Sequence, residues 1–191
     1  MHRRFRIGLL MLASLAGLSA PLAATPALAN EAQCKFGGGF QVISRERTDS
    51  VGHDIIARPV PANAAGPCIF AKRSGDIEIS TADEADTVLG LAGTHLVMDR
   101  GTGPSRVLVI YDLAARKVAL TLAYDDQVPV KIAASGVTLA AVTGPASAAN
   151  CPKFKEYKAN GLGAALTIET RIAFPGLART ESGKPRCIAQ Q

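Results

Sequence analysis

The sequence predicts an all-β fold, mainly antiparallel, built as a single sandwich or barrel-like domain of about nine or ten strands. Apolar and polar residues alternate in several segments, most clearly over 166–174, where Ile168 falls on the opposite side from Glu169. That period of two is typical of half-buried strands. No long helical segment separates these runs, and strands joined by short turns pair antiparallel. With 48% hydrophobic and 19% charged residues, the chain is neither disordered nor a coiled coil.

The expected strands cover 39–45, 55–60, 68–72, 77–79, 94–99, 106–112, 118–124, 128–132, 136–142 and 166–174. Short turns connect three of them, so 94–124 is predicted to form a three-stranded meander. In its first turn, Asp99 is expected to face Arg106 across the mouth of the hairpin. In its second turn, Asp112 and its neighbours resemble the hairpin of a β-propeller blade, in which the acidic residue braces the turn. A propeller needs at least about four copies, so only the hairpin is carried over.

A short helix is predicted near the C-terminus, over 152–159. Asn150 stands near its N-cap, Pro152 in its first turn and Gly161 beyond its end, which are the preferred places of these residue types. Residues spaced by three are expected to face the core: Cys151, Phe154 and Tyr157. The lysines of the helix are left to face water: Lys153, Lys155 and Lys158.

The first 29 residues have the three parts of a secretory signal peptide. Basic residues precede Ile7, an uncharged stretch covers 7–18, and an Ala-x-Ala site ends at Ala29. The uncharged stretch is shorter than the roughly 20 residues that a membrane-spanning helix needs, so no transmembrane segment is expected after signal removal. The signal is alanine-rich and no Asn-x-Ser/Thr acceptor follows it. We therefore expect a periplasmic or secreted protein in which residues 30–191 form one domain.

The net charge changes when the signal is removed. Three of the 21 basic residues and none of the 16 acidic ones lie in the signal, so the mature chain carries +2 instead of +5. Nucleic-acid binding is therefore not expected, since aromatic residues, at 5%, are also too few for base stacking. The remaining charge is uneven: 30–150 hold 11 basic and 13 acidic residues, whereas 151–191 hold seven and three.

Four cysteines in an exported chain predict two disulfides, for which three pairings are possible. We favour Cys34 with Cys68 and Cys151 with Cys187, because each pair ties one end of the mature chain to the sheet. Each bridge would close a loop of about 35 residues and contribute roughly 3 to 4 kcal/mol. No Cys-x-x-Cys pair is present, which argues against a zinc site and a thioredoxin-like role.

No metal or cofactor site is predicted. The acidic groups at 83–86 and 125–126 lack the spacing of a calcium loop and are expected to form solvated turns. The glycine-rich segments 37–39 and 101–103 lack the lysine and the following helix of nucleotide-binding loops. The first of these is expected to lead into the first strand.

The favoured function is a non-catalytic binding or interaction module of the cell envelope. Its candidate binding residues are Lys153, Lys155 and Lys158, joined by Lys184 and Arg186. The partner would be an anionic envelope component or a secreted protein, because lipid phosphates and acidic glycans are the polyanions outside a bacterial membrane. Alternatively, the same lysines form only a solvated helix face without a binding role.

The alternative function is an exported hydrolase whose site is assembled from dispersed residues: His53, His95, Asp99 and Asp112. Along one strand, His95 and Asp99 would lie roughly 13 Å apart, too far for a base and its orienting carboxylate. The Gly-x-Ser-x-Gly and Ser-x-x-Lys signatures of common serine hydrolases are absent from the mature chain. The sequence therefore disfavours this alternative.

Overall fold

The computed structural model describes residues 31–61, 66–79, 83–103 and 106–190, and the predicted signal peptide lies outside them. The amino-terminal half, 31–112, contains β1 (Gln33–Gly37), β2 (Phe40–Glu46), β3 (His53–Pro59), β4 (Ile77–Glu78), β5 (Asp86–Ala92), β6 (His95–Arg100) and β7 (Arg106–Asp112). The carboxyl-terminal half, 117–190, contains β8 (Lys117–Tyr124), β9 (Lys131–Ala133), β10 (Gly136–Pro145), α1 (Phe154–Ala159), β11 (Gly163–Ala173) and β12 (Ala178–Gln190).

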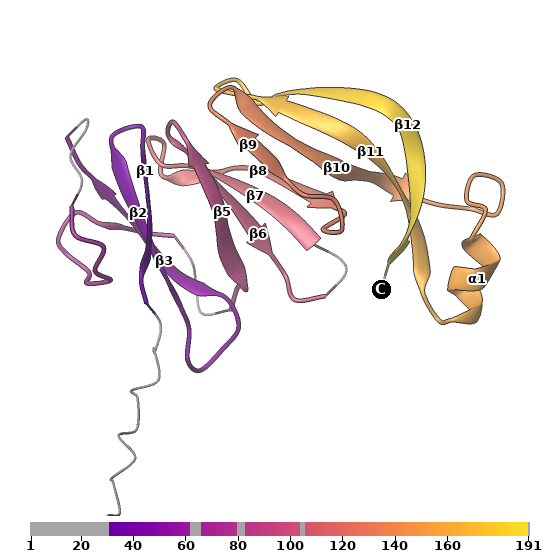
Figure 1. Ribbon diagram of the computed structural model, residues 1–191, viewed down its shortest axis with the longest axis horizontal. Coiled ribbons are helices and arrows are strands. Elements are labelled where there is room, and N and C mark those ends of the chain that lie inside the picture. Colours follow the sequence, from indigo (N-terminus) through magenta and orange to yellow (C-terminus); the bar gives the residue numbers. More distant parts are fainter. Residues whose placement is uncertain (1–30, 62–65, 80–82, 104–105, 191) are drawn as a thin grey trace, which may run out of the picture.

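The strands form two antiparallel sheets (Figure 1). The small sheet has the order β1-β2-β3-β4, and the large sheet has the order β12-β11-β10-β8-β7-β6-β5, with β9 paired to β10. The predicted all-β, mainly antiparallel fold with one short helix near the C-terminus is confirmed, and β6-β7-β8 is the predicted meander. The described residues contain 12 strands, more than the expected nine or ten.

The first core is a sandwich between the small sheet and one end of the large sheet. Val42 and Ile55 contribute to it from the small sheet, and each is at most 2% exposed. Leu96, Met98 and Val109 contribute from the large sheet and are as deeply buried. Burying a side chain of this size stabilises the fold by about 1.5 to 3 kcal/mol, so this layer holds the small sheet in place.

The second core lies on the opposite face of β6 and β7. Val97 and Ile110 enter it from these strands, and Val137 and Ile172 enter it from β10 and β11, all fully buried. Strands covered on both faces need apolar residues at every position. This explains why the central parts of β6 and β7 are continuous apolar runs without alternation.

The large sheet curls around this second core until β9 approaches β5. Gly90 in β5 permits the approach, because a Cβ there would lie 2.7 Å from Cδ1 of Ile132 in β9. The enclosure is barrel-like, and buried side chains fill its interior. The fold thus combines the two architectures that the sequence left open.

The β1–β2 turn contacts the β5–β6 turn and fixes the small sheet against the large one. The glycine-rich segment 37–39 leads into β2, the strand predicted over 39–45, as expected; it also ends β1 and forms this turn. Gly38 has a φ of +57°, and a Cβ there would lie 2.3 Å from the backbone of Gly93. Only glycine allows this approach.

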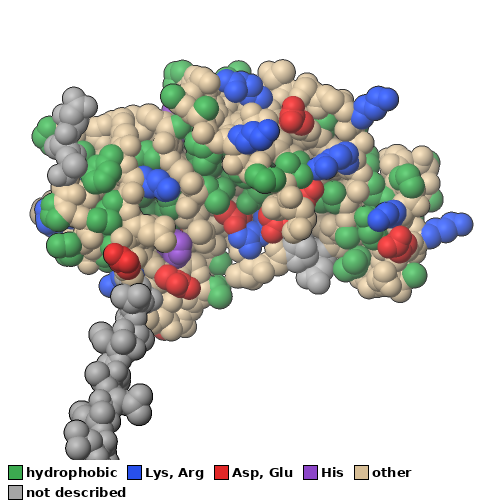
Figure 2. All heavy atoms as spheres, in the orientation of Figure 1, with side chains coloured by type: hydrophobic (Ala, Val, Ile, Leu, Met, Phe, Trp, Pro, Cys, Tyr) green, Lys and Arg blue, Asp and Glu red, His purple; other side chains and the backbone are tan. Residues whose placement is uncertain are grey.

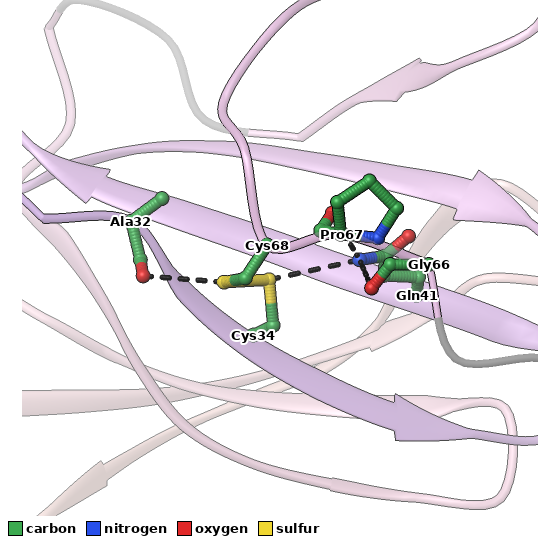
Figure 3. Close-up of a disulfide and its surroundings, with 6 residues drawn as sticks. All are labelled: Ala32, Cys34, Gln41, Gly66, Pro67 and Cys68. Carbon is green, nitrogen blue, oxygen red and sulfur yellow. Dashed lines mark hydrogen bonds between the residues drawn. A yellow bond between two sulfur atoms is a disulfide. The ribbon is translucent and has the colours of Figure 1, made fainter.

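The predicted disulfide between Cys34 of β1 and Cys68 is present (Figure 3). Beside it, the buried Gln41 donates a hydrogen bond of 3.1 Å from its side-chain amide to the carbonyl of Pro67. These contacts hold the segment around Cys68 against the small sheet without pairing it as a strand. The strand predicted over 68–72 is therefore wrong.

The second predicted disulfide joins Cys151, just before α1, to Cys187 of β12. Cys151 is buried, and Phe154 and Tyr157 are half-buried, so the side of the helix that was expected to face the core does lie inward. The bridge fixes the helix beside the edge of the large sheet.

The helix begins at Phe154, two residues later than the sequence predicts. Lys153 occupies the N-cap and makes no capping hydrogen bond through its side chain. The Asn150 side chain accepts instead from the backbone N–H of Ser147, at 2.6 Å. Asn150 therefore closes the preceding turn rather than capping the helix.

An irregularity interrupts β12, the edge strand of the large sheet. Glu169 and Thr167 of β11 are paired with Ser182 and Arg186, so Ile168 alone stands opposite the residues between them. These residues form a bulge: Gly183, Lys184 and Pro185. A bulge bends its strand and redirects side chains, and proline is tolerated at an edge because no neighbour needs its N–H.

Candidate binding site

A pocket of about 330 Å³ lies on the large sheet, between the segment that precedes β9 and the bulge of β12. Its cationic side chains are Lys131, Lys184 and Arg186, and we call it the cationic pocket. Its uncharged and acidic polar groups are Thr138, Ser182 and Glu169. Val128, Leu139 and Ala140 supply apolar lining.

The register of the strands brings the pocket residues together. Lys131 of β9 is paired with Thr138 of β10, and Glu169 of β11 lies between Ala140 and Ser182. Direct cross-strand partners project from the same face of a sheet. Residues far apart along the chain therefore share one face, and the bulge adds Lys184 beside them.

Two contacts organise the polar groups of the pocket. Ser182 Oγ donates a hydrogen bond of 2.8 Å to Glu169 Oε1. Arg186 Nη2 lies 3.5 Å from Asp125 Oδ2, and the Asp125 side chain is only 7% exposed. Asp125 also accepts the backbone N–H of Gln127. The arginine is thus tethered from one side, and its guanidinium has further donors to offer.

The remaining cations of the carboxyl-terminal half are mostly without ionic partners. Among the described residues, Lys131 and Lys184 make no ion pair, and both side chains are exposed. Figure 2 shows Lys and Arg side chains gathered over the region of β9 to β12. Cations that lack a carboxylate partner retain their full attraction for an external anion.

Of the three sequence-predicted lysines, Lys155 and Lys158 lie on α1 and Lys153 is its N-cap, and none of them lines the cationic pocket. All three are exposed: Lys153, Lys155 and Lys158. Lys158 lines a second, shallower hollow of about 480 Å³ between the helix and the ends of β10 and β11. Its ammonium group lies 5.8 Å from the ring centre of Phe154, within the range of a cation–π contact. The two further predicted residues, Lys184 and Arg186, both line the cationic pocket.

Charges in the amino-terminal half are used internally. Arg58 donates two hydrogen bonds to Asp76, of 2.9 and 2.8 Å, and the Asp76 side chain is 3% exposed. These bonds hold the pKa of Asp76 below its ordinary value, although burial acts in the opposite direction. Asp54 bonds both Arg45 and Arg47, and its pKa is lowered chiefly by the bond from Arg45. The Arg58–Asp76 pair is buried and stabilises the fold, whereas Arg45 and Asp54 pair nearer the surface.

The carboxylates of the alternative hydrolase site are engaged in turns. Asp99 pairs with Arg106 through two hydrogen bonds, one of them 2.9 Å long, as the sequence predicts. Asp112 accepts the backbone N–H groups of Ala114 and Ala115, so it braces its turn as the hairpin resemblance implies.

The two histidines occupy structural positions. His95 is 6% exposed and stacks on Phe174, with 4.4 Å between the ring centres. It is the cross-strand partner of Asp112, yet no hydrogen bond joins these two described side chains. His53 begins β3, with a buried Nδ1 that lacks a partner within the described residues. Neither histidine lines the cationic pocket or the hollow beside α1.

The acidic cluster at 83–86 also serves the fold. Arg100 bonds Asp86 at 2.7 Å and Glu84 at 2.6 Å. Within the described part of the chain, no group of three or more His, Cys, Asp or Glu side chains is arranged to hold a metal ion. No helix in that part has the length and apolar character needed to cross a membrane.

Comparison with models of protein families, with curated proteins and with solved structures finds no match for this chain.

Proposed function

We propose that this protein is an exported, non-catalytic binding module whose carboxyl-terminal half contacts an anionic component of the bacterial envelope. One observation carries the proposal: cations without ionic partners are concentrated in that half of the molecule, on α1 and around the cationic pocket. The two disulfides and the apparent signal support an oxidising compartment outside the cytoplasm, and the alanine-rich signal favours the periplasm.

The lysines of α1 are the proposed outer contact. They project from a helix that a disulfide fixes to the large sheet, so little flexibility of the scaffold is lost on binding. A lysine near an anionic surface contributes about 1 kcal/mol at moderate ionic strength. Several exposed lysines on one short segment therefore give weak, salt-sensitive adhesion rather than tight recognition.

Co-sedimentation with an isolated envelope fraction tests this proposal. The oxidised mature protein is compared with a variant carrying Lys153→Gln, Lys155→Gln and Lys158→Gln. We expect the variant to bind at least about fivefold more weakly at low salt. The difference should vanish in high salt, because the ions screen exposed charges.

The matched control removes the same charge from exposed lysines outside α1: Lys35→Gln, Lys72→Gln and Lys117→Gln. It should keep most of the binding. Equal loss in both triple variants would show that only net charge matters, and unchanged binding of the α1 variant would refute the contact. Mass spectrometry of the periplasmic form should show a chain that starts at Asn30 with both disulfides intact.

A further inference from the structure

We propose that the cationic pocket binds a sugar ring carrying one acidic group, a carboxylate or a phosphate. This inference rests on the proposed function, since it names the part of an anionic envelope ligand that the carboxyl-terminal half would recognise. It concerns residues of β9 to β12, which are distinct from the lysines of α1.

The charge of the pocket selects an anion. Among the described residues, Lys131 and Lys184 make no ion pair, and the Arg186 guanidinium pairs with the buried Asp125, at 3.5 Å. Glu169 is the one acidic side chain among the pocket-lining residues. An ammonium group attracts an anion as a point charge, and a guanidinium can donate two parallel hydrogen bonds to a carboxylate or phosphate.

The uncharged and acidic groups favour a sugar over a simple anion. Glu169 would repel a free ion, but its carboxylate can accept hydrogen bonds from ring hydroxyls. Its bond to Ser182 fixes one carboxylate oxygen and leaves the remaining lone pairs available. Thr138 adds a hydroxyl that both donates and accepts.

The lining and the size of the pocket fit one ring. Val128, which is half-buried, and Pro129, which is exposed, present apolar surface against which the C–H face of a sugar can pack. At about 330 Å³, the pocket stands at the lower end of the roughly 300 to 1,000 Å³ of small-molecule sites. It has room for a single sugar unit, either free or at the end of a polymer.

Calorimetric titration of the oxidised mature protein tests the inference with four probes: glucuronate, glucose 6-phosphate, glucose and inorganic phosphate. At least one acidic sugar should bind about tenfold or more tightly than both glucose and inorganic phosphate. Which of the two acidic sugars binds better tells whether the natural group is a carboxylate or a phosphate. Equal affinity for glucose, equal affinity for inorganic phosphate, or no binding of either acidic sugar would overturn the inference.

The variant Lys131→Gln with Lys184→Gln should lower the affinity for the acidic sugar by about tenfold or more. Both side chains are exposed and unpaired among the described residues, so its melting temperature should stay close to that of the wild type. Unchanged affinity in this variant would also refute the site. A second variant, Glu169→Ala, should reduce the preference for the acidic sugar over inorganic phosphate, because the hydroxyl acceptor is lost.

The two proposals can fail separately. If no acidic sugar binds while envelope binding still depends on the α1 lysines, the sugar site is refuted and the proposed function stands. If the acidic sugar binds but the α1 variant keeps full envelope binding, the envelope contact through α1 is refuted and the sugar site stands.

Discussion

The two halves of the molecule contain similar numbers of basic side chains and use them differently. In the amino-terminal half, six of the eight described basic residues form ion pairs: Arg45, Arg47, Arg58, Lys72, Arg100 and Arg106. In the carboxyl-terminal half, two of the nine described basic residues do so: Arg179 and Arg186.

The difference teaches that net charge alone says little about a binding surface. In the amino-terminal half, Arg58 donates to the buried Asp76 and Arg100 to the buried Asp86, where removing either partner leaves an uncompensated charge. The lysines of the carboxyl-terminal half are exposed, and surface pairs would stabilise them little. The same residue class therefore maintains the fold in one half and remains available in the other.

The largest expected effect comes from breaking a pair that the comparison treats as structural. Asp76→Asn should lower the free energy of unfolding by about 3 to 5 kcal/mol near neutral pH, because Arg58 loses its partner. Chemical denaturation measures this. Lys131→Gln is the matched change in the other half and should alter stability by at most about 0.5 kcal/mol.

The same variant has a pH signature. The pKa of Asp76 is lowered in the folded state, so its stabilisation is complete above the unfolded value near 3.9 and is lost as pH falls through the folded value. Wild-type stability should therefore fall below about pH 4, and the fall should be smaller in Asp76→Asn. An equal loss of unfolding free energy at acidic pH in the wild type and the variant would contradict a structural role for the Arg58–Asp76 pair.

Shortening a buried side chain in each core tests whether the two halves of the molecule unfold separately. Leu96→Ala in the first core and Leu139→Ala in the second should each cost about 2 to 5 kcal/mol. Since β6 and β7 carry both cores, we expect each variant to keep a single thermal transition, measured by calorimetry. A second transition in Leu139→Ala would show that the carboxyl-terminal half melts by itself.

Removing either disulfide should cost roughly 3 to 4 kcal/mol, and the two costs should be similar because the sequence separations of 34 and 36 are nearly equal. The functional effects should differ. Replacing Cys151 and Cys187 by Ser should weaken envelope binding, since α1 loses its attachment to β12. Replacing Cys34 and Cys68 should leave envelope binding intact at a temperature where both variants are folded; the reverse pattern would contradict the assignment of binding to the carboxyl-terminal half.

The contact between the two sheets should be sensitive to a side chain at position 38. Gly38→Ala and Gly93→Ala both place a side chain at positive φ, with a cost of about 1 to 2 kcal/mol. A Cβ on Gly38 also meets the backbone of Gly93, whereas a Cβ on Gly93 meets nothing within 4 Å. Gly38→Ala should therefore be the more destabilising of the two by thermal melting, and equal costs would show that the turns can separate freely.

The sequence predicts strands well where one face is buried. The strands β8 and β11, the meander and both disulfide pairs are confirmed. By contrast, β12 has no regular alternation, because its first nine residues are exposed and its pairing with β11 decides its conformation. The apolar residues at 68–72 were misleading, since a disulfide and the Gln41 amide hold that segment.

The cationic pocket could be predicted only in part. Lys184 and Arg186 were noted as basic residues, but nothing local connects them with Lys131 or Glu169. Their meeting depends on the register of β9 to β12 and on a bulge between Ser182 and Arg186. A glycine and a proline within three residues, at 183–185, were the available signal that this strand is interrupted.

The bulge of β12 has a consequence for the behaviour of the protein in a crowded compartment. A long unpaired edge strand is a template on which another chain can add a strand and begin aggregation. Here the edge is bent at Gly183, lacks one N–H at Pro185 and carries charges at Arg179, Glu181 and Lys184. An incoming strand would meet a broken hydrogen-bonding row and charged side chains. The irregularity that shapes the pocket thereby also discourages the protein from polymerising through its own sheet.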